Sequence, residues 1–409
     1  MSEWLVVRRV QPSTRRRGAA PIPKTASAPS TPEITIRVAP EHAPSRHQLP
    51  DPNEIGMAAR PMPVSLIAPI VTATSAADAI LRDARAAGVT WGLQTLGVDA
   101  KRFDGAGVKV AIIDTGIKRD HAAFAHLKGA IDEADFTYKP GGTFGDGAAL
   151  DTDGHGTHCA GTICGGMVDG VRIGVAPNIE RLFVAKAIGG TRGSAALLDA
   201  LNWAAYTVRA NVISMSLGFD FVGYRASLVK ASVHADAATS MALIAFRDNI
   251  RIFDAWMNEL RARRKDGFDP LVVAASGNES GRPTFVVGKA SPSEADSVIA
   301  VGAVDAALAI APFSNADVTF VGPGVDVVSA GINEQLSVLS GTSMACPHIA
   351  GLAALYWQFA RTGRPAATAE RVQRMMATSA EDYFKEFHTH EPSDVGGGMP
   401  RAPEQRPPP

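Results

Sequence analysis

This 409-residue sequence has few cysteines, few aromatic residues and almost no net charge. Its three cysteines are too few, and odd in number, for a disulfide framework, so we expect free thiols, as in a reducing compartment. Forty basic side chains against 41 acidic ones leave a formal net charge of -1, which offers no field for recruiting nucleic acid or an anionic membrane. Neither a disulfide scaffold nor a polyanion-binding protein is therefore expected.

Long apolar runs are missing as well. Residues 4–7 are too few for the core of a signal peptide. The most apolar segment, residues 344–360, is interrupted by Pro347 and is shorter than the roughly 20 apolar residues that a membrane-spanning helix needs. We therefore expect a soluble, cytoplasmic protein with no membrane partner; export by a route without a recognisable signal is the alternative.

Proline is concentrated at the two ends of the chain. Of the 27 prolines, 12 lie in residues 1–70 and six in residues 391–409. Residues 1–63, which are rich in Pro and Arg, and residues 405–409 are therefore predicted to be disordered tails. Between them we expect a short leader at 64–90 and one folded domain over 91–404.

Within 91–404, apolar strand-like segments alternate with helix-like segments. This alternation is typical of an α/β fold in which helices cover both faces of a mostly parallel central sheet, giving three layers. The predicted strands are 108–113, 182–187, 212–215, 271–275 and 298–304, and the predicted helices are 155–164, 194–208, 342–360 and 367–378.

A helical insertion is expected near residues 219–270. Its apolar positions within 224–264 are spaced as in a long helix, and basic residues precede Gly267, as is common at a helix C-terminus. The pattern favours an elaborated structural helix pair. A surface for a partner or for a second copy of the chain is the alternative.

Chemically useful side chains follow the predicted strands or begin the predicted helices. Asp114 follows a buried strand, His155 enters a helix between glycines, Ser343 begins the most apolar helix, and Asn278 follows a strand and a glycine. Acyl transfer needs a nucleophile, a base, a carboxylate that orients the base, and donors to an oxyanion. These four residues supply one of each.

Neighbouring polar residues are interpreted as structural. His121, His158 and His348 are expected to be packed or hydrogen-bonded, because His155 already provides a base, and Asp153 is expected to support the loop before His155.

The chain resembles the subtilisin-like serine proteases, or subtilases, from about residue 91 to about residue 404. The Asp-Thr-Gly at Asp114, the His-Gly-Thr-His at His155, the Gly-Asn ending at Asn278 and the Gly-Thr-Ser-Met-Ala-x-Pro-His around Ser343 occur in the family's order. The resemblance implies a three-layer subtilisin-like fold and a serine endopeptidase. Ser343 would be the nucleophile, His155 the general base, Asp114 its orienting carboxylate, and Asn278, with the Ser343 amide, the oxyanion hole.

The same resemblance implies how a protein or peptide substrate would bind. One edge would pair with the substrate backbone, a second edge would face it, and a mostly apolar pocket without a buried charge would favour large apolar side chains. The residues implied are Ser216, Leu217 and Gly218 for the first edge, Gly193 and Ser194 for the second, and Ala275, Ser276, Gly277 and the segment 290–292 for the pocket wall.

Two departures from the family concern calcium and the N-terminus. At the positions matching the usual calcium ligands stand Ala123 and Val168, which have no side-chain oxygen; Asp169 could support a weaker site. No cofactor is therefore expected to be required, although calcium binding is possible. Residues 65–70 are similar to the leader of intracellular subtilisins, whose Leu-Ile-Pro element blocks the cleft. We expect residues 64–90 to cover the site until they are trimmed, with Pro69 keeping the backbone out of register; a linker packed elsewhere is the alternative.

Two other functions compete with a general endopeptidase. One is a self-silenced or non-catalytic module that binds peptides. The other is a dedicated maturase that cuts one cognate protein, for which the insertion would provide the recognition surface.

Overall fold

A large, mostly parallel sheet forms the centre of the fold. The computed structural model describes residues 3–7, 34–38, 57–98, 103–333, 335–363, 366–383 and 391–404, and within these ranges this sheet has eight strands. All neighbouring strands are parallel except β7 and β8, which are antiparallel. In spatial order the strands are β16 (Phe320–Pro323), β15 (Val298–Val304), β14 (Leu271–Ala275), β12 (Val212–Met215), β6 (Lys109–Asp114), β11 (Arg181–Lys186), β7 (Ile131–Asp135) and β8 (Thr143–Phe144).

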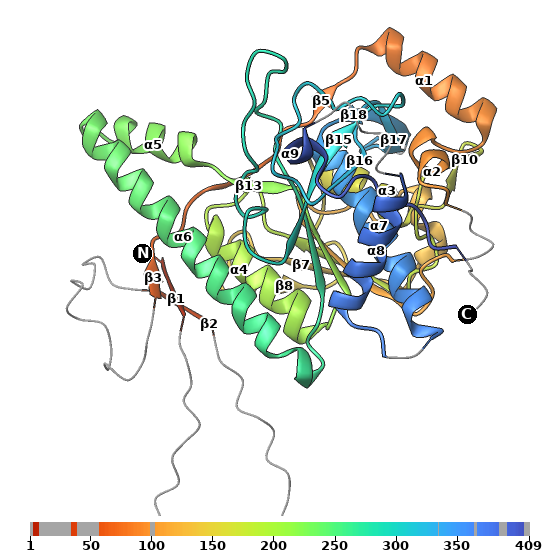
Figure 1. Ribbon diagram of the computed structural model, residues 1–409. Coiled ribbons are helices and arrows are strands. Elements are labelled where there is room, and N and C mark those ends of the chain that lie inside the picture. The colour runs from red at the N-terminus through yellow and green to blue at the C-terminus, as the bar shows by residue number, and fades with distance from the viewer. Residues whose placement is uncertain are drawn as a thin grey trace, which may run out of the picture.

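Helices cover both faces of this sheet (Figure 1). Alternate residues of β6 point to opposite faces: Val110 and Ile112 belong to one apolar core, Ala111 and Ile113 to the other. The first core includes side chains of α3 (His155–Cys164) and α7 (Thr342–Arg361); the second includes those of α4 (Ser194–Asn202) and α6 (Ala235–Ala262). The predicted three-layer α/β fold is confirmed.

Smaller elements surround these layers. The strands are β1 (Glu3–Val7), β2 (Ile34–Val38), β3 (Met57–Ala59), β4 (Val64–Leu66), β5 (Ile70–Val71), β9 (Met167–Val168), β10 (Val171–Arg172), β13 (Leu217–Phe219), β17 (Val327–Ala330) and β18 (Leu336–Ser340). The helices are α1 (Thr74–Ala87), α2 (Trp91–Thr95), α5 (Phe221–Lys230), α8 (Ala369–Tyr383) and α9 (Pro392–Val395), with 3-10 turns at Ala122–Leu127 and Arg264–Asp266 and a π turn at Trp203–Thr207.

Three predicted strands, 212–215, 271–275 and 298–304, have the observed bounds, and the other two are shifted by one residue. Strand β7 was not predicted. Three of its five residues are acidic, so it lacks an apolar run. Its Asp132 instead pairs with Arg181 of β11, at 2.7 Å between Oδ2 and Nε.

The predicted disorder of residues 1–63 is wrong for three short strands. β1 pairs antiparallel with β2 and with β3, and Leu5 and Ala59 are buried in the core that contains α4 and α6. The prediction used the average composition of residues 1–63, which is rich in proline, but the three strands themselves contain no proline. Residues 405–409 are outside the described ranges.

The insertion forms two helices, α5 and α6; α5 and the N-terminal end of α6 project from one side of the molecule (Figure 1). Residues 231–234 separate them, and Ser232 there has φ +66°, which ends a helix. The insertion is therefore a pair of helices. The pair leaves Val229, Leu243 and Ile244 between 40% and 54% exposed, and the proposed partner surface stays a prediction.

None of the helices in the described ranges is long and apolar enough to cross a membrane.

Helix α7 is almost entirely buried against the sheet. It carries His348, whose Nδ1 lies 2.8 Å from the Met344 carbonyl oxygen, and whose Nε2 is buried without a hydrogen-bond partner in the described part of the chain. His158 of α3 is equally buried, with Nε2 3.1 Å from the Val327 carbonyl oxygen. Burial lowers the pKa of His158 to about 3 and that of His348 to about 4, so both rings are neutral and structural, as expected.

These two histidines predict a loss of stability in acid. Below pH 6.5 the unfolded chain protonates both rings while the folded chain does not, so the free energy of unfolding should fall as pH drops from about 6.5 toward 4. Each ring contributes up to about 1.4 kcal/mol per pH unit. Denaturant unfolding at several pH values measures this slope. His348→Asn should flatten it, whereas the same substitution at the exposed His234 should not; equal slopes in both variants would contradict the assignment.

Candidate active site

Asp114 and His155 meet in a fully buried hydrogen bond. Asp114 ends β6, and His155 is the first residue of α3. The Oδ1 atom of Asp114 lies 2.8 Å from Nδ1 of His155 and also accepts a hydrogen bond from the Thr115 amide at 2.7 Å. Because a carboxylate only accepts, Nδ1 carries the proton and Nε2 is the basic atom of the ring.

Asp151, which the sequence pattern did not reveal, organises the loop before His155. Its side chain is 3% exposed. Burial tends to raise the pKa of Asp151, but hydrogen bonds to its carboxylate bring it below the usual value. Asp153 contributes as expected, since its carboxylate accepts the His155 amide at 3.2 Å. The donors to Asp151 are the amides of Asp153, Gly154 and Thr157 and the hydroxyls of Thr115 and Thr157.

Ser343 and Asn278 come together at the start of α7. Ser343 is the second residue of this helix, in the turn whose amides have no intrahelical acceptor. Asn278 follows β14, and its Oδ1 accepts both the amide and the hydroxyl of Thr342, each at 2.9 Å. These two donors fix the orientation of the amide group, so Nδ2 of Asn278 is the atom available to a ligand.

Cys159 connects the two helices that carry His155 and Ser343. Its Sγ lies 3.8 Å from Nδ1 of His155 and 3.3 Å from the carbonyl oxygen of Ser343. Within the described part of the chain, the ligand atoms of Asp114, His155 and Cys159 lie within 4.8 Å of one another and could hold a metal ion. Burial raises the pKa of Cys159, which favours the neutral thiol and weakens it as a ligand.

The charge state of His155 depends on its surroundings. Burial alone would lower its pKa, but the adjacent Asp114 carboxylate raises it well above 6.5. The arrangement therefore stabilises an imidazolium at this position.

The leader crosses this site. The hydroxyl of Ser343 donates to the carbonyl oxygen of Ile67 at 2.9 Å, and Nδ2 of Asn278 donates to the next carbonyl oxygen, that of Ala68, also at 2.9 Å. Nε2 of His155 is buried without a hydrogen-bond partner among the described residues. Residues 67 and 68 thus occupy the groups that the sequence assigns to nucleophile and oxyanion hole.

The edge predicted from Ser216, Leu217 and Gly218 holds the leader as a strand. β4 pairs antiparallel with β13, Leu66 opposite Leu217 and Ser65 opposite Gly218, and the Ile67 amide lies 3.5 Å from the Ser216 carbonyl oxygen.

Gly193 and Ser194, predicted as the second edge, contact Met62, two residues before the leader begins: the Ser194 amide donates to the Met62 carbonyl at 2.8 Å.

A cavity of about 350 Å³ lies beside Ile67 and β13. Ala275 and Ser276 are buried and, like Gly277, are not among the residues that line this cavity, so their assignment to the pocket wall stays a prediction. Gly277 has φ +112°, a conformation that a side chain would strain, and it turns the chain toward Asn278. The cavity is lined by Ser65, Leu66, Ile67, Gly218, Phe219, Asp220, Phe221, Val222, Phe246, Glu279, Val287, Gly288, Lys289, Ala290, Ser291, Glu294 and Asn315.

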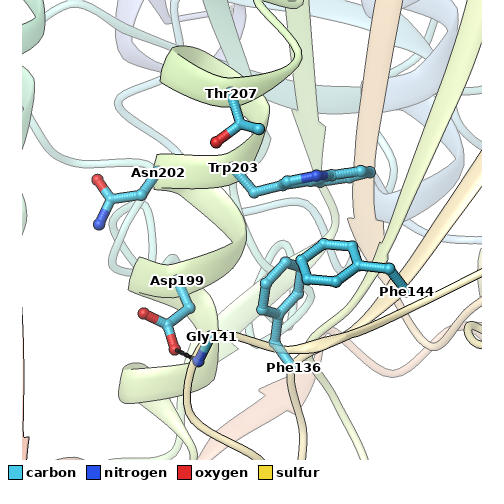
Figure 2. A pocket seen from close by; sticks show the side chains of 7 residues that line it. All are labelled: Phe136, Gly141, Phe144, Asp199, Asn202, Trp203 and Thr207. Atoms are coloured by element: carbon cyan, nitrogen blue, oxygen red, sulfur yellow. Dashed lines mark hydrogen bonds between the residues drawn. The ribbon is translucent and has the colours of Figure 1, made fainter.

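A second cavity, of about 460 Å³, has an aromatic wall made by Phe136, Phe144 and Trp203 (Figure 2). The ring centroids of these residues lie 5.9 to 6.2 Å apart. Asp199, on its rim, already accepts the Gly141 amide and pairs with Arg192. None of the candidate catalytic residues lines this cavity.

The positions compared with a calcium site offer few oxygen ligands. Ala123 and Val168 are buried, and the carboxylate of Asp169 lies 3.3 Å from the guanidinium of Arg85 in α1. Asp169 therefore faces a cation of the chain itself.

Comparisons with known proteins agree with this geometry. Residues 105–398 match the Subtilase family. The chain is 34% identical over 271 residues to the cuticle-degrading serine protease of Arthrobotrys oligospora, covering 64% of this chain but only 55% of that protein, so the match spans little more than half of that relative. It is also 34% identical over 260 residues to the major intracellular serine protease of Bacillus subtilis, covering 63% and 70% of the two chains. With subtilisin DY of Bacillus licheniformis the identity is 32% over 300 residues, covering 71% and 90%.

The family match includes all four candidate residues: Asp114 at the end of a strand, His155 and Ser343 at the starts of helices, and Asn278 three residues after β14. This chain belongs to the subtilase family.

Proposed function

We propose that this protein is a serine endopeptidase that hydrolyses peptide bonds through an acyl-enzyme intermediate. The observation that carries the proposal is the buried Asp114–His155 hydrogen bond, close to Ser343 and to the oriented amide of Asn278. Membership of the subtilase family and the relatives named as proteases support it.

In this mechanism, the Ser343 oxygen attacks the carbonyl carbon of the substrate while Nε2 of His155 takes the hydroxyl proton. Asp114 stabilises the resulting imidazolium, and Nδ2 of Asn278 with the Ser343 amide binds the oxyanion. Collapse of the tetrahedral intermediate breaks the C–N bond, and the leaving amine receives the proton from His155. Water then attacks the ester, again with His155 as the base, and releases the acid and Ser343.

The substrate would be an extended polypeptide. The backbone of β13 already pairs with a strand, and main-chain pairing of this kind recognises peptides of many sequences. The cavity beside Ile67 contains Phe219, Phe221 and Phe246. Of its three carboxylates, Glu279 and Glu294 are on exposed residues, and Asp220 accepts the Gly223 amide at the start of α5. These features favour a large apolar side chain at the residue before the cleaved bond.

We further propose that the leader holds the site inactive until it is removed. Acylation requires one carbonyl to meet both Ser343 and Asn278, but here they bind two consecutive carbonyls, those of Ile67 and Ala68. Pro69, which follows, has no amide hydrogen and a fixed φ, and so limits how the backbone can shift.

An intracellular location fits the thiols: Cys159, Cys164 and Cys346 are all unpaired and buried, as expected for a reducing compartment. One relative is named an intracellular protease.

Displacing the leader should activate the full-length chain. Ile67 is 4% exposed, so Ile67→Asp would bury a carboxylate and should expel the segment from the site. We expect a fluorophosphonate to label this variant at least about tenfold faster than the wild type, which corresponds to about 1.4 kcal/mol of lost leader binding. Ile70→Asp, at a leader position that is 48% exposed, serves as the matched control and should change the rate little. Equal labelling of the wild type and Ile67→Asp would contradict inhibition by the leader.

Ser343 should be the residue that reacts. Adding Ser343→Ala to the Ile67→Asp chain should reduce both fluorophosphonate labelling and peptide hydrolysis to background, because no other hydroxyl is expected to act as the nucleophile. Ser227→Ala, at an exposed position in α5, should leave both unchanged. Labelling that survives Ser343→Ala would reject the assignment, and a folded Ile67→Asp chain that never labels would favour a peptide-binding module.

The pH dependence should report His155. Its raised pKa means that the ring stays protonated at pH 6.5, so kcat/KM of the Ile67→Asp chain should rise with pH through a value well above 6.5. Asp114→Asn removes the main cause of the increase and leaves burial, so the rising limb should move to lower pH while kcat falls. If the rising limb of the pH profile does not move in Asp114→Asn, a group other than His155 controls it.

A further inference from the structure

Met62 is held more firmly than a residue in a linker needs to be. It is 1% exposed, and both of its main-chain groups are bound by one residue of α4. Its amide donates to the Ser194 hydroxyl oxygen at 3.0 Å, and its carbonyl accepts the Ser194 amide at 2.8 Å. We call Gly193, Ser194 and Asn249, which together hold this residue, the Met62 seat.

Asn249 brings the insertion into this seat. It lies in α6 and is 2% exposed. Its Oδ1 accepts the Ser194 hydroxyl at 2.5 Å, and its Nδ2 donates to the carbonyl oxygens of Arg60 and Ala245 at 2.7 and 2.8 Å. Because the Ser194 hydroxyl donates its hydrogen bond to Asn249, a lone pair of the Ser194 oxygen is directed to the Met62 amide. The insertion thus determines how Ser194 can bind a polypeptide.

Gly193 makes room for the main chain. It has φ +51°, and a Cβ atom at this position would lie 2.0 Å from the Met62 carbonyl oxygen. A side chain here would block the seat both sterically and through backbone strain. The seat therefore accepts backbone at close range and recognises groups that every residue except proline possesses.

The seat continues into the candidate active site. From Met62 the chain runs through Pro63, whose carbonyl accepts the Asp220 amide at 2.9 Å, into β4 and then to Ile67 at Ser343. Met62 is the fifth residue before Ile67, a span of about 17 Å in an extended chain. The two sites lie along one continuous strand path and not on separate surfaces.

We propose that the Met62 seat is a distal subsite of the peptide-binding groove, which the insertion adds for protein substrates. This inference rests on the proposed protease function. Once Met62 and the leader have left, an unfolded polypeptide occupies the same path, with an apolar side chain at the fifth residue before the one whose carbonyl is attacked. A chain long enough to reach the seat gains its two main-chain hydrogen bonds and the burial of that side chain, whereas a shorter peptide gains neither.

The test uses the full-length chain carrying Met62→Asp and Ile67→Asp, which empties both the seat and the active site. Two fluorogenic coumarin amides are compared, acetyl-Met-Ala-Val-Ser-Leu-Phe and acetyl-Val-Ser-Leu-Phe. We expect kcat/KM to be about tenfold or more higher for the longer peptide, which corresponds to about 1.4 kcal/mol. Replacing its Met by Asp should abolish the advantage, a result that needs no further protein variant.

Asn249→Ala in this background should reduce the ratio of kcat/KM for the long and short peptides to near one. The matched control is Asn258→Ala, on an exposed face of the same helix, which should preserve the ratio. Circular dichroism and thermal unfolding establish that the variants are folded, and if Asn249→Ala does not fold, the comparison of Met and Asp peptides decides.

The outcomes separate the two proposals. If the short peptide is hydrolysed and Ser343 is labelled, but the long peptide has no advantage, the distal subsite is overturned while the protease function stands. The subsite is also overturned if the advantage persists with Asp in place of Met and in Asn249→Ala. If Ser343 is not labelled and neither peptide is cleaved, the protease function fails and the subsite with it.

Discussion

The hydrogen bond between Asp114 and His155 is the interaction on which the rest of the site depends. Both side chains are buried, so the carboxylate has little access to water and is stabilised by its donors, of which the imidazole is one. The bond fixes the tautomer of the ring, directs Nε2 away from Asp114 and favours the imidazolium. These are the properties that a base next to a serine hydroxyl needs. The loop around Asp151 and the close packing of α3 against α7 serve mainly to hold this pair in place.

The leader is bound by the same groups that would act on a substrate. Ser343, Asn278 and β13 all contact the leader. In a productive complex Ser343 and Asn278 would both contact the same carbonyl group, whereas here Ser343 donates to the Ile67 carbonyl and Asn278 to the Ala68 carbonyl. In the proposed function, inhibition and substrate recognition therefore rest on one set of hydrogen bonds. A change that weakens the binding of any backbone to β13 would weaken both, whereas a change confined to Ile67 affects the leader alone.

Much of the fold and site could be predicted from the sequence. Buried parallel strands are continuous apolar runs, and the four candidate residues stand next to glycines and strand ends, where a pattern is visible. Other features leave no such signal. Asp151 and Asp153 are equivalent in a sequence, and only the loop geometry gives Asp151 the larger number of donors. Strand β7 is held by ion pairs and neighbours, and Leu5 becomes buried only when the chain returns to α4 and α6.

The role of Asn249 is equally hidden in the sequence, because two of its three partners lie 55 and 189 residues away along the chain. An isolated asparagine inside a helix would be interpreted as a solvent-facing residue. Its burial is tolerated because both ends of its amide are satisfied, by the Ser194 hydroxyl and by two carbonyls. The insertion and the N-terminal segment thus satisfy each other's buried polar groups, and removing either would leave the other with unpaired ones. Because hydrogen bonds are directional, this coupling also positions Ser194 more narrowly than apolar packing of α6 against β3 could do alone.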